Sequence, residues 1–196
     1  MTGRRAAAWM LLGVLLAGCA RSPVGSAGMT PTSGAGTVTA PVLATSPVPG
    51  LAESTERVTA STVASDTTLS DITQALTDAG FLGGRQRTFQ GQSKDLSMIL
   101  SRSMVFTDGS GADRFLQWVK SHADGLFGLT TEIRGLAVQG RTGWMFTAPQ
   151  CACPGAQPRV IGIVRDGSRI DWLTINGPQA TSDRLRAVLA APTSND

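Results

Sequence analysis

The sequence predicts an α+β domain built on a single, mostly antiparallel sheet with its helices packed on one face. Strand-like segments follow one another in runs instead of alternating strictly with helices. The pair Asp166-Gly167 joins the last two of these segments, and Asp-Gly is the strongest short signal for a hairpin. Beyond the first 18 residues, every aromatic residue lies at or after Phe81. The hydrophobic core is therefore expected in the later part of the chain.

Three helices are expected because apolar residues recur at helical spacing. Gly80 suits the left-handed position after the first helix, and Pro192 stops the third. Ser110 and Asp113 match a capping box at the start of the second helix. The helices are expected over 69–79, from Ser110 to Gly125, and from Thr181 to Pro192.

Strands are expected at 87–90, 96–107, 136–139, 144–147, 160–165 and 169–175, where apolar residues alternate or run together. Arg102 interrupts the apolar face of the second of these strands. A buried charge is costly unless it is paired or lies at the mouth of a pocket. Arg102 is therefore a candidate for an ion pair or for binding an anionic ligand or partner. The alternative is a bulge at 101–103 that turns Arg102 toward solvent.

The chain is expected to divide into four segments. Residues 20–51 are mainly Ser, Thr, Gly, Ala, Pro and Val, with Arg21 as their only charge. Such a composition buries too little apolar surface to offset the entropy of ordering. The four expected segments are a signal peptide at 1–18, a flexible tether at 19–65, a folded α+β domain at 66–192 and a tail at 193–196.

The amino terminus is typical of a secretory signal peptide. Arg4 and Arg5 precede an apolar run of 12 residues at 6–17. A membrane span needs about 20 apolar residues, so this run is short for a permanent anchor. An uncleaved anchor is the alternative interpretation.

The signal ends in the sequence Leu-Ala-Gly-Cys at 16–19, which resembles the lipobox of bacterial lipoproteins at all four positions. The resemblance implies cleavage between Gly18 and Cys19 and transfer of diacylglycerol to the Cys19 thiol. It also implies lipid anchoring at the extracytoplasmic face of the cell membrane. The alternative is an ordinary signal peptide in which Cys19 occurs by chance.

The order of elements also carries a resemblance. Helix, strands, helix, a run of strands and a last helix, with Ala-Gly-Phe at 79–81, Val-Phe at 105–106 and Gly-Ala at 111–112, resemble the small α+β lipoprotein domains of actinobacteria. Some of those domains have PsbP/Mog1-like sandwiches. The group has no common chemistry, so the resemblance implies a fold and no site residues.

The charge of the chain does not indicate nucleic-acid binding. The chain has 17 Lys and Arg against 14 Asp and Glu. Removal of Arg4 and Arg5 with the signal leaves 15 basic residues against 14 acidic ones, a net charge of +1. Binding to a phosphate backbone needs a clustered basic face, and the densest stretch, at 85–87, holds two charges.

Cys151 and Cys153 are the thiols that remain once Cys19 is lipidated. In an oxidising compartment we expect them to form a disulfide, although free or intermolecular thiols are alternatives. A bridge across one residue closes a very small ring, and a strained bridge is easily reduced, so the pair is also a redox candidate. Metal binding would need another ligand, and His122 is the only histidine. We expect no metal and no cofactor.

The sequence offers no catalytic set. Neither the Gly-x-Ser-x-Gly nor the Ser-x-x-Lys motif occurs, and His122 is expected to be solvated near the end of the second helix. Trp118, Trp144 and Trp172 are expected in the core. If two of them were exposed together, they would mark a ligand or partner surface.

The resulting hypothesis is a lipid-anchored protein of the cell envelope that binds a protein or lipid partner and catalyses no reaction. The first alternative is a carrier of a lipid or small hydrophobic ligand, which a large apolar cavity between sheet and helices would favour. The second alternative is an extracytoplasmic redox protein that uses Cys151 and Cys153.

Overall fold

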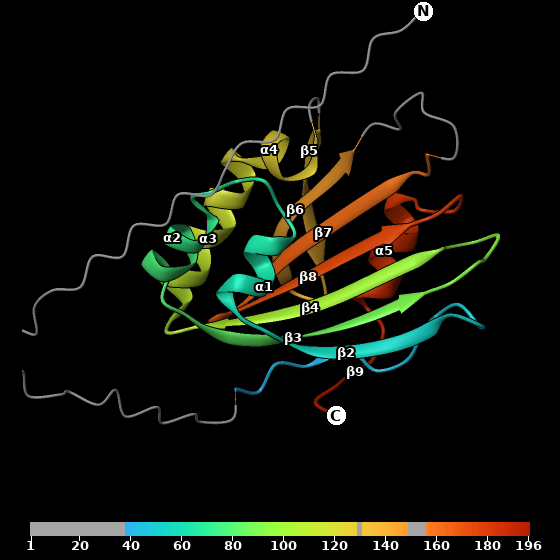
Figure 1. The fold of residues 1–196 in the computed structure, drawn as a ribbon, viewed down its shortest axis with the longest axis horizontal. Coiled ribbons are helices and arrows are strands. Elements are labelled where there is room, and N and C mark those ends of the chain that lie inside the picture. Colours follow the sequence, from blue (N-terminus) through green and yellow to red (C-terminus); the bar gives the residue numbers. More distant parts are fainter. Residues whose placement is uncertain (1–37, 129–130, 149–155) are drawn as a thin grey trace, which may run out of the picture. The chain divides into compact units, whose positions relative to one another are not determined.

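A seven-stranded antiparallel sheet organises the computed structural model, which describes residues 38–128, 131–148 and 156–196 (Figure 1). The strand order is β2-β3-β4-β8-β7-β6-β5, and every neighbouring pair is antiparallel. These strands are β2 (Ala52–Val58), β3 (Phe81–Gln90), β4 (Met98–Phe106), β5 (Glu132–Val138), β6 (Arg141–Ala148), β7 (Arg159–Asp166) and β8 (Arg169–Asn176). A separate two-stranded ribbon pairs β1 (Val42–Leu43) with β9 (Thr193–Ser194). The helices are α1 (Ala60–Ser65), α2 (Ile72–Asp78), α3 (Gly109–Ser121), α4 (Ala123–Phe127) and α5 (Ser182–Leu189).

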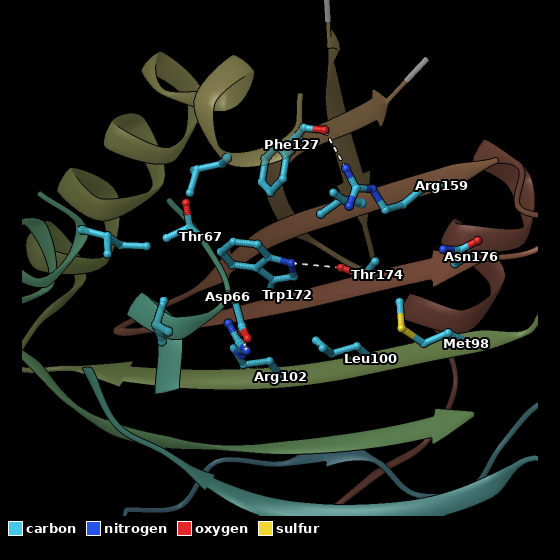
Figure 2. Close-up of a pocket in the computed structure, with 14 residues that line it drawn as sticks. Asp66, Thr67, Met98, Leu100, Arg102, Phe127, Arg159, Trp172, Thr174 and Asn176 are labelled. Carbon is cyan, nitrogen blue, oxygen red and sulfur yellow. Dashed lines mark hydrogen bonds and ion pairs between the residues drawn. The ribbon is translucent and has the colours of Figure 1, made fainter. Parts of the chain in front are cut away.

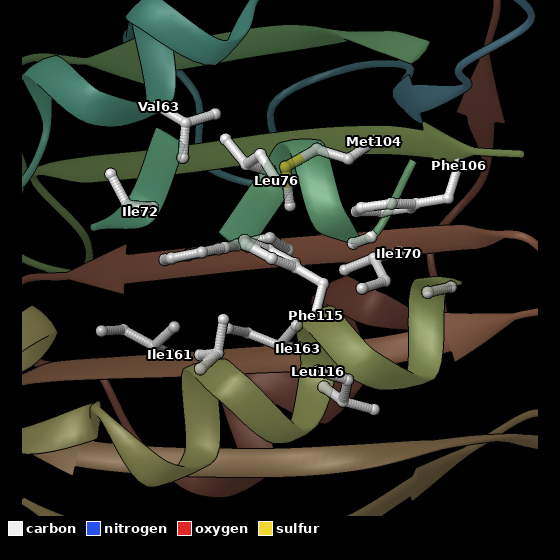
Figure 3. Close-up of a cluster of buried hydrophobic side chains, with 14 of the residues drawn as sticks. Val63, Ile72, Leu76, Met104, Phe106, Phe115, Leu116, Ile161, Ile163 and Ile170 are labelled. Atoms are coloured by element: carbon white, nitrogen blue, oxygen red, sulfur yellow. The ribbon is translucent and has the colours of Figure 1, made fainter. Parts of the chain in front are cut away.

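The predicted α+β class and antiparallel sheet are confirmed, but the placement of all helices on one face is wrong. Helices α1 to α4 cover one face, where Ile161 and Ile163 of β7 join their core cluster (Figure 3). Helix α5 covers the other face, where Val160 and Val164 join the cluster of Leu185. A strand that is apolar on both faces must be covered on both faces. The continuous apolar run at 160–164 therefore explains the second layer.

Tight turns join the strands in the carboxyl-terminal half of the sheet. The predicted Asp166-Gly167 hairpin is confirmed, with Asp166 opposite Arg169 and Gly167 at φ 61°. Strands β5 and β6 are joined through Gln139 and Gly140, which have φ values of 51° and 78°. Two successive residues with positive φ match the turn that follows the twist of a hairpin.

The domain begins earlier than the sequence predicts. Within the expected flexible tether at 19–65, Val42 and Leu43 form the buried strand β1, and residues 52–65 form β2 and α1. Strand β2 pairs with β3 along its whole length, and almost all of its side chains are exposed. An edge strand of this kind is held by main-chain hydrogen bonds, so its composition does not reveal it. Thr59 and Thr62 then form a capping box at the start of α1.

The end of the chain also belongs to the fold. Residues 193–196 were expected to form a tail, but Thr193 and Ser194 pair with β1. The buried guanidinium of Arg87 donates to the carbonyl oxygens of Leu43 and Asp196 at 3.1 and 2.8 Å. The segment around β1 and the end of the chain are therefore both held at the face that α5 covers.

The cap of helix α3 lies two residues before the predicted one. Asp108, not Ser110, is the N-cap, and its carboxylate accepts from the Gly111 amide at 2.7 Å. Hydrogen bonds from the Ser110 hydroxyl and the Gly111 amide hold the pKa of Asp108 below its ordinary value of 3.8. The helix ends at Ser121, and the short helix α4 follows it before Gly128.

Strand β3 is longer than the predicted strand at 87–90. It begins at Phe81 and passes through Gly83, where its register with β4 shifts. Glycines break the apolar pattern from which strands are predicted, although the backbone pairing continues through them.

Within the described ranges, no helix is long and apolar enough to cross a membrane.

Candidate functional site

A cavity of about 190 Å³ lies between the sheet and the helices of the α1-to-α4 face (Figure 2). Its floor consists of alternate residues on three neighbouring strands. These residues are Met98, Leu100 and Arg102 on β4, Trp172, Thr174 and Asn176 on β8, and Arg159 and Ile161 on β7. The opposite wall consists of Val63, Asp66, Thr67 and Ile72 from α1, α2 and their connection, and of Leu126 and Phe127 from α4.

The register of the sheet explains which side chains meet in this cavity. Directly opposite residues of antiparallel strands point to the same face, and the next residues on that face are two positions away. Arg102 therefore stands beside Trp172, and Leu100 beside Thr174. Two positions further, Asn176 has Met98 on one side and Arg159 on the other. The cavity thus runs along the strands from Arg102 to Arg159 (Figure 2).

Arg102 lies at one end of the cavity and is only 3% exposed. Its Nε donates to Gln86 Oε1 at 2.6 Å, and its Nη2 forms an ion pair with Asp66. Gln86 in turn donates to Glu56, and the guanidinium lies 5.6 Å from the centroid of the Trp172 ring. Of the interpretations left open for Arg102, the structure therefore shows the ion pair. The predicted bulge is wrong, because the register on both sides of Arg102 is continuous.

Arg159 lies at the other end of the cavity. Its Nη2 donates to the carbonyl oxygen of Phe127 at 2.5 Å, at the end of α4. No acidic side chain forms an ion pair with Arg159 in the part of the chain that the structure describes. All 14 Asp and Glu residues of the chain lie in that part. Arg159 is therefore a half-buried guanidinium at the cavity that has none of these 14 residues within ion-pair distance.

The three candidate tryptophans occupy different places, and the cavity is lined by Trp172 alone among them. Trp172 is buried and its Nε1 donates to Thr174 Oγ1 at 3.2 Å. Trp118 is half-buried and stacks on His122, with 4.4 Å between ring centroids. Trp144 is half-buried below Lys120, whose Nζ lies 3.7 Å from the ring centroid. The predicted core position is confirmed fully for Trp172 and in part for the other two.

His122 caps the end of α3, close to where the sequence places it. Its Nδ1 lies 2.9 Å from the carbonyl oxygen of Trp118 and 3.0 Å from Ser121 Oγ. A carbonyl oxygen can only accept, so a hydrogen bond between Nδ1 and Trp118 requires the tautomer that carries its proton on Nδ1. Its Nε2 lies 3.7 Å from Asp71. His122 does not line the cavity.

Several predicted sites lie outside the described residues. These are the cleavage site between Gly18 and Cys19, the lipidated Cys19, and the Cys151–Cys153 pair. In the described ranges, no group of three or more His, Cys, Asp and Glu side chains is arranged to hold a metal ion.

Comparison with known proteins gives one structural likeness. No protein-family model and no curated protein sequence matches the chain. The extracellular domain of PknH from Mycobacterium tuberculosis is similar to it with a TM-score of 0.35 and 11% sequence identity, over 71% of this chain and 80% of that chain. This likeness is too low to assign a family or a function.

Sequence reasoning found Arg102 and Trp172 but missed Asp66, Gln86 and Arg159 as residues of this site. Asp66 is the first residue of the domain that the sequence predicts, and no local pattern marks it as part of a site. Arg159 precedes the apolar run at 160–164, which predicts a strand from residue 160 onward. The alternation of 159, 161 and 163 on one face was the available signal, but it does not say which helices cover that face.

Proposed function

We propose that this chain is a lipid-anchored protein of the cell envelope that binds one small amphipathic molecule and catalyses no reaction. The observation that carries the proposal is the cavity, whose floor combines four apolar side chains with an arginine at each end. Ligand sites are concave, mostly apolar and provided with a few placed polar groups.

The size of the cavity limits the ligand. A dry cavity of about 150 Å³ accommodates benzene, whereas pockets for drug-sized ligands measure about 300–1,000 Å³. A cavity of about 190 Å³ therefore favours a ligand with one ring or one short chain over a lipid with two acyl chains. Trp172 offers a flat apolar surface for such a group, next to Leu100.

The groups around the cavity favour binding over catalysis. Asp66 is the one carboxylate among the lining residues, and it is paired with Arg102. Thr174 already accepts the indole proton of Trp172. General acid–base chemistry needs a group that can exchange a proton with the substrate, and a carboxylate held by a guanidinium is poorly suited to that role.

The sequence at 16–19 supports the location of this function. It resembles the lipobox, and the resemblance implies a diacylglycerol-modified Cys19 at the extracytoplasmic face of the membrane. Two or three acyl chains are sufficient for stable anchoring. The ligand site would then stand outside the cytoplasmic membrane.

Filling the cavity tests the proposal. The full chain is purified from its native envelope as wild type, Leu100→Trp and Leu82→Trp, and the extracted small molecules are compared by mass spectrometry. Leu100 is on the cavity floor, whereas Leu82 is 56% exposed outside the cavity. We expect a molecule that copurifies with wild type and Leu82→Trp to be lost from Leu100→Trp.

Circular dichroism of each variant confirms that it is folded. The proposal is contradicted if the same molecules accompany all three proteins, or if no small molecule accompanies the wild type.

A further inference from the structure

We infer that the ligand is a small monoanion, such as a carboxylic acid with an apolar ring or short chain, and that Arg159 binds its charged group. This inference rests on the proposed function and names the ligand class for the same cavity. Its basis is the difference between the two arginines that line the cavity.

Arg102 is already neutralised. Asp66 supplies an ion pair, Gln86 an acceptor and Trp172 an aromatic face. A cation that is already paired with a carboxylate gains less from a ligand anion than an unpaired cation does. The end of the cavity near Arg102 is therefore suited to the apolar part of the ligand, beside Trp172 and Leu100.

Arg159 is different because, among the described residues, its guanidinium forms no ion pair. None of the 14 acidic residues pairs with it, and one hydrogen bond, to Phe127, is recorded for its guanidinium within the described residues. A guanidinium has five N–H donors in a planar fork that matches a carboxylate. The carbonyl oxygen of Phe127 orients this fork over the cavity without neutralising it (Figure 2).

The net charge of the lining points in the same direction. Two arginines and one aspartate line the cavity, which leaves one positive charge. A charge at a partly apolar cavity is stabilised by an opposite charge on the ligand, because water solvates it less well there than at an open surface. A neutral or cationic ligand would leave this charge uncompensated.

The test compares phenylacetate with phenylacetamide, which have the same ring and nearly the same shape but differ in charge. The full chain is supplied in phosphatidylcholine nanodiscs, and dissociation constants are measured by saturation-transfer NMR against empty nanodiscs. We expect wild type to bind phenylacetate about tenfold more tightly than phenylacetamide, the effect of one charged hydrogen-bond partner. The preference should decrease as salt is added.

Matched arginine variants locate the anion. Arg159→Gln should bind phenylacetate and phenylacetamide with similar affinity, whereas Arg159→Lys should retain part of the preference for phenylacetate. Arg57→Gln makes the same change in net charge at an exposed position of β2 and should leave the preference intact. A preference that persists in Arg159→Gln, or is lost equally in Arg57→Gln, overturns the inference.

The outcomes separate this inference from the proposed function. If both compounds bind equally and Leu100→Trp abolishes both, the cavity binds ligands but not as anions, and only the inference fails. If neither compound binds, both proposals fail for ligands of this size. A loss of phenylacetate binding in nanodiscs that contain phosphatidylglycerol would assign the anion to a lipid headgroup and overturn the assignment to a small acid.

Discussion

Arg102 places a full positive charge on the face of the sheet that α1 to α4 cover. Burial of this charge depends on a partner from a distant part of the sequence. Asp66 lies in the connection between α1 and α2, and its side chain is half exposed. Removal of one member of such a pair costs more than removal of both, because the remaining buried charge is uncompensated. The two residues are therefore expected to be energetically coupled.

We predict that Asp66→Ala lowers the free energy of unfolding by about 2 kcal/mol, and that Asp66→Ala with Arg102→Met costs less than the sum of the single changes. A double-mutant cycle from urea unfolding measures the coupling. Asp183→Ala is the control, because Asp183 is 97% exposed and pairs with Arg186 at the surface; it should cost less than about 0.5 kcal/mol. Additive effects at Asp66 and Arg102 would contradict the prediction.

At the residue scale, the sequence revealed that Arg102 is unusual but could not identify its partner. An arginine in an apolar face predicts a pair, a ligand or a bulge, and local pattern does not choose among them. Asp66, 36 residues away, is brought to Arg102 by the packing of α1 against the sheet. Contacts of this separation follow from the tertiary arrangement and leave no mark on local periodicity.

The elements of the fold differ in how well the sequence predicts them. Helix α5 and the β7–β8 hairpin can be predicted from local sequence. Thr181 caps the start of the helix, and Asp166-Gly167 forms the turn of the hairpin. Strand β2 cannot be predicted in this way, because its side chains are mostly exposed and main-chain pairing with β3 holds it in place. Edge strands are the elements for which apolar patterning is weakest.

The contact between α2 and α3 gives a prediction at this scale. A Cβ atom added at Gly111 would lie 2.1 Å from the carbonyl oxygen of Ala79, so the two helices approach closely because residue 111 has no side chain. Helix propensity alone would make Gly111→Ala stabilising by about 1 kcal/mol. We predict instead a loss of about 1–3 kcal/mol from steric overlap, measured by thermal or urea unfolding.

Gly135→Ala is the control for this change, because no atom lies within 4 Å of the added Cβ there. It should change the stability little. A Gly111→Ala protein that is as stable as wild type would show that the approach of α3 to Ala79 is not limited by this glycine.

The whole molecule combines a folded domain with an amino-terminal segment whose function is predicted from sequence. The domain covers its sheet on both faces, with α1 to α4 on one and α5 with the β1–β9 ribbon on the other. The cavity lies on the first of these faces.

We predict that the full chain incorporates alkyne-tagged palmitate in its bacterial host and that Cys19→Ser abolishes the label. The unprocessed precursor should accumulate in Cys19→Ser and in wild type treated with a globomycin-type inhibitor of the lipoprotein signal peptidase. The proposed acceptor of the lipid is the thiol of Cys19, which a serine would not replace. The double variant Cys151→Ser with Cys153→Ser is the control and should keep the label. A labelled Cys19→Ser protein would exclude Cys19 as the lipidation site.

The sequence by itself determined the α+β class, the antiparallel pairing around Asp166-Gly167, the α5 helix and the anomalous charge at Arg102. Each of these depends on interactions between residues close in the chain or on the cost of burying one side chain. Only the tertiary structure decided that helices cover both faces, that residues 52–65 belong to the domain, and that Arg102 and Arg159 mark the two ends of one cavity. These features depend on strand order and on helix placement, which arise when segments distant in sequence bury apolar surface together.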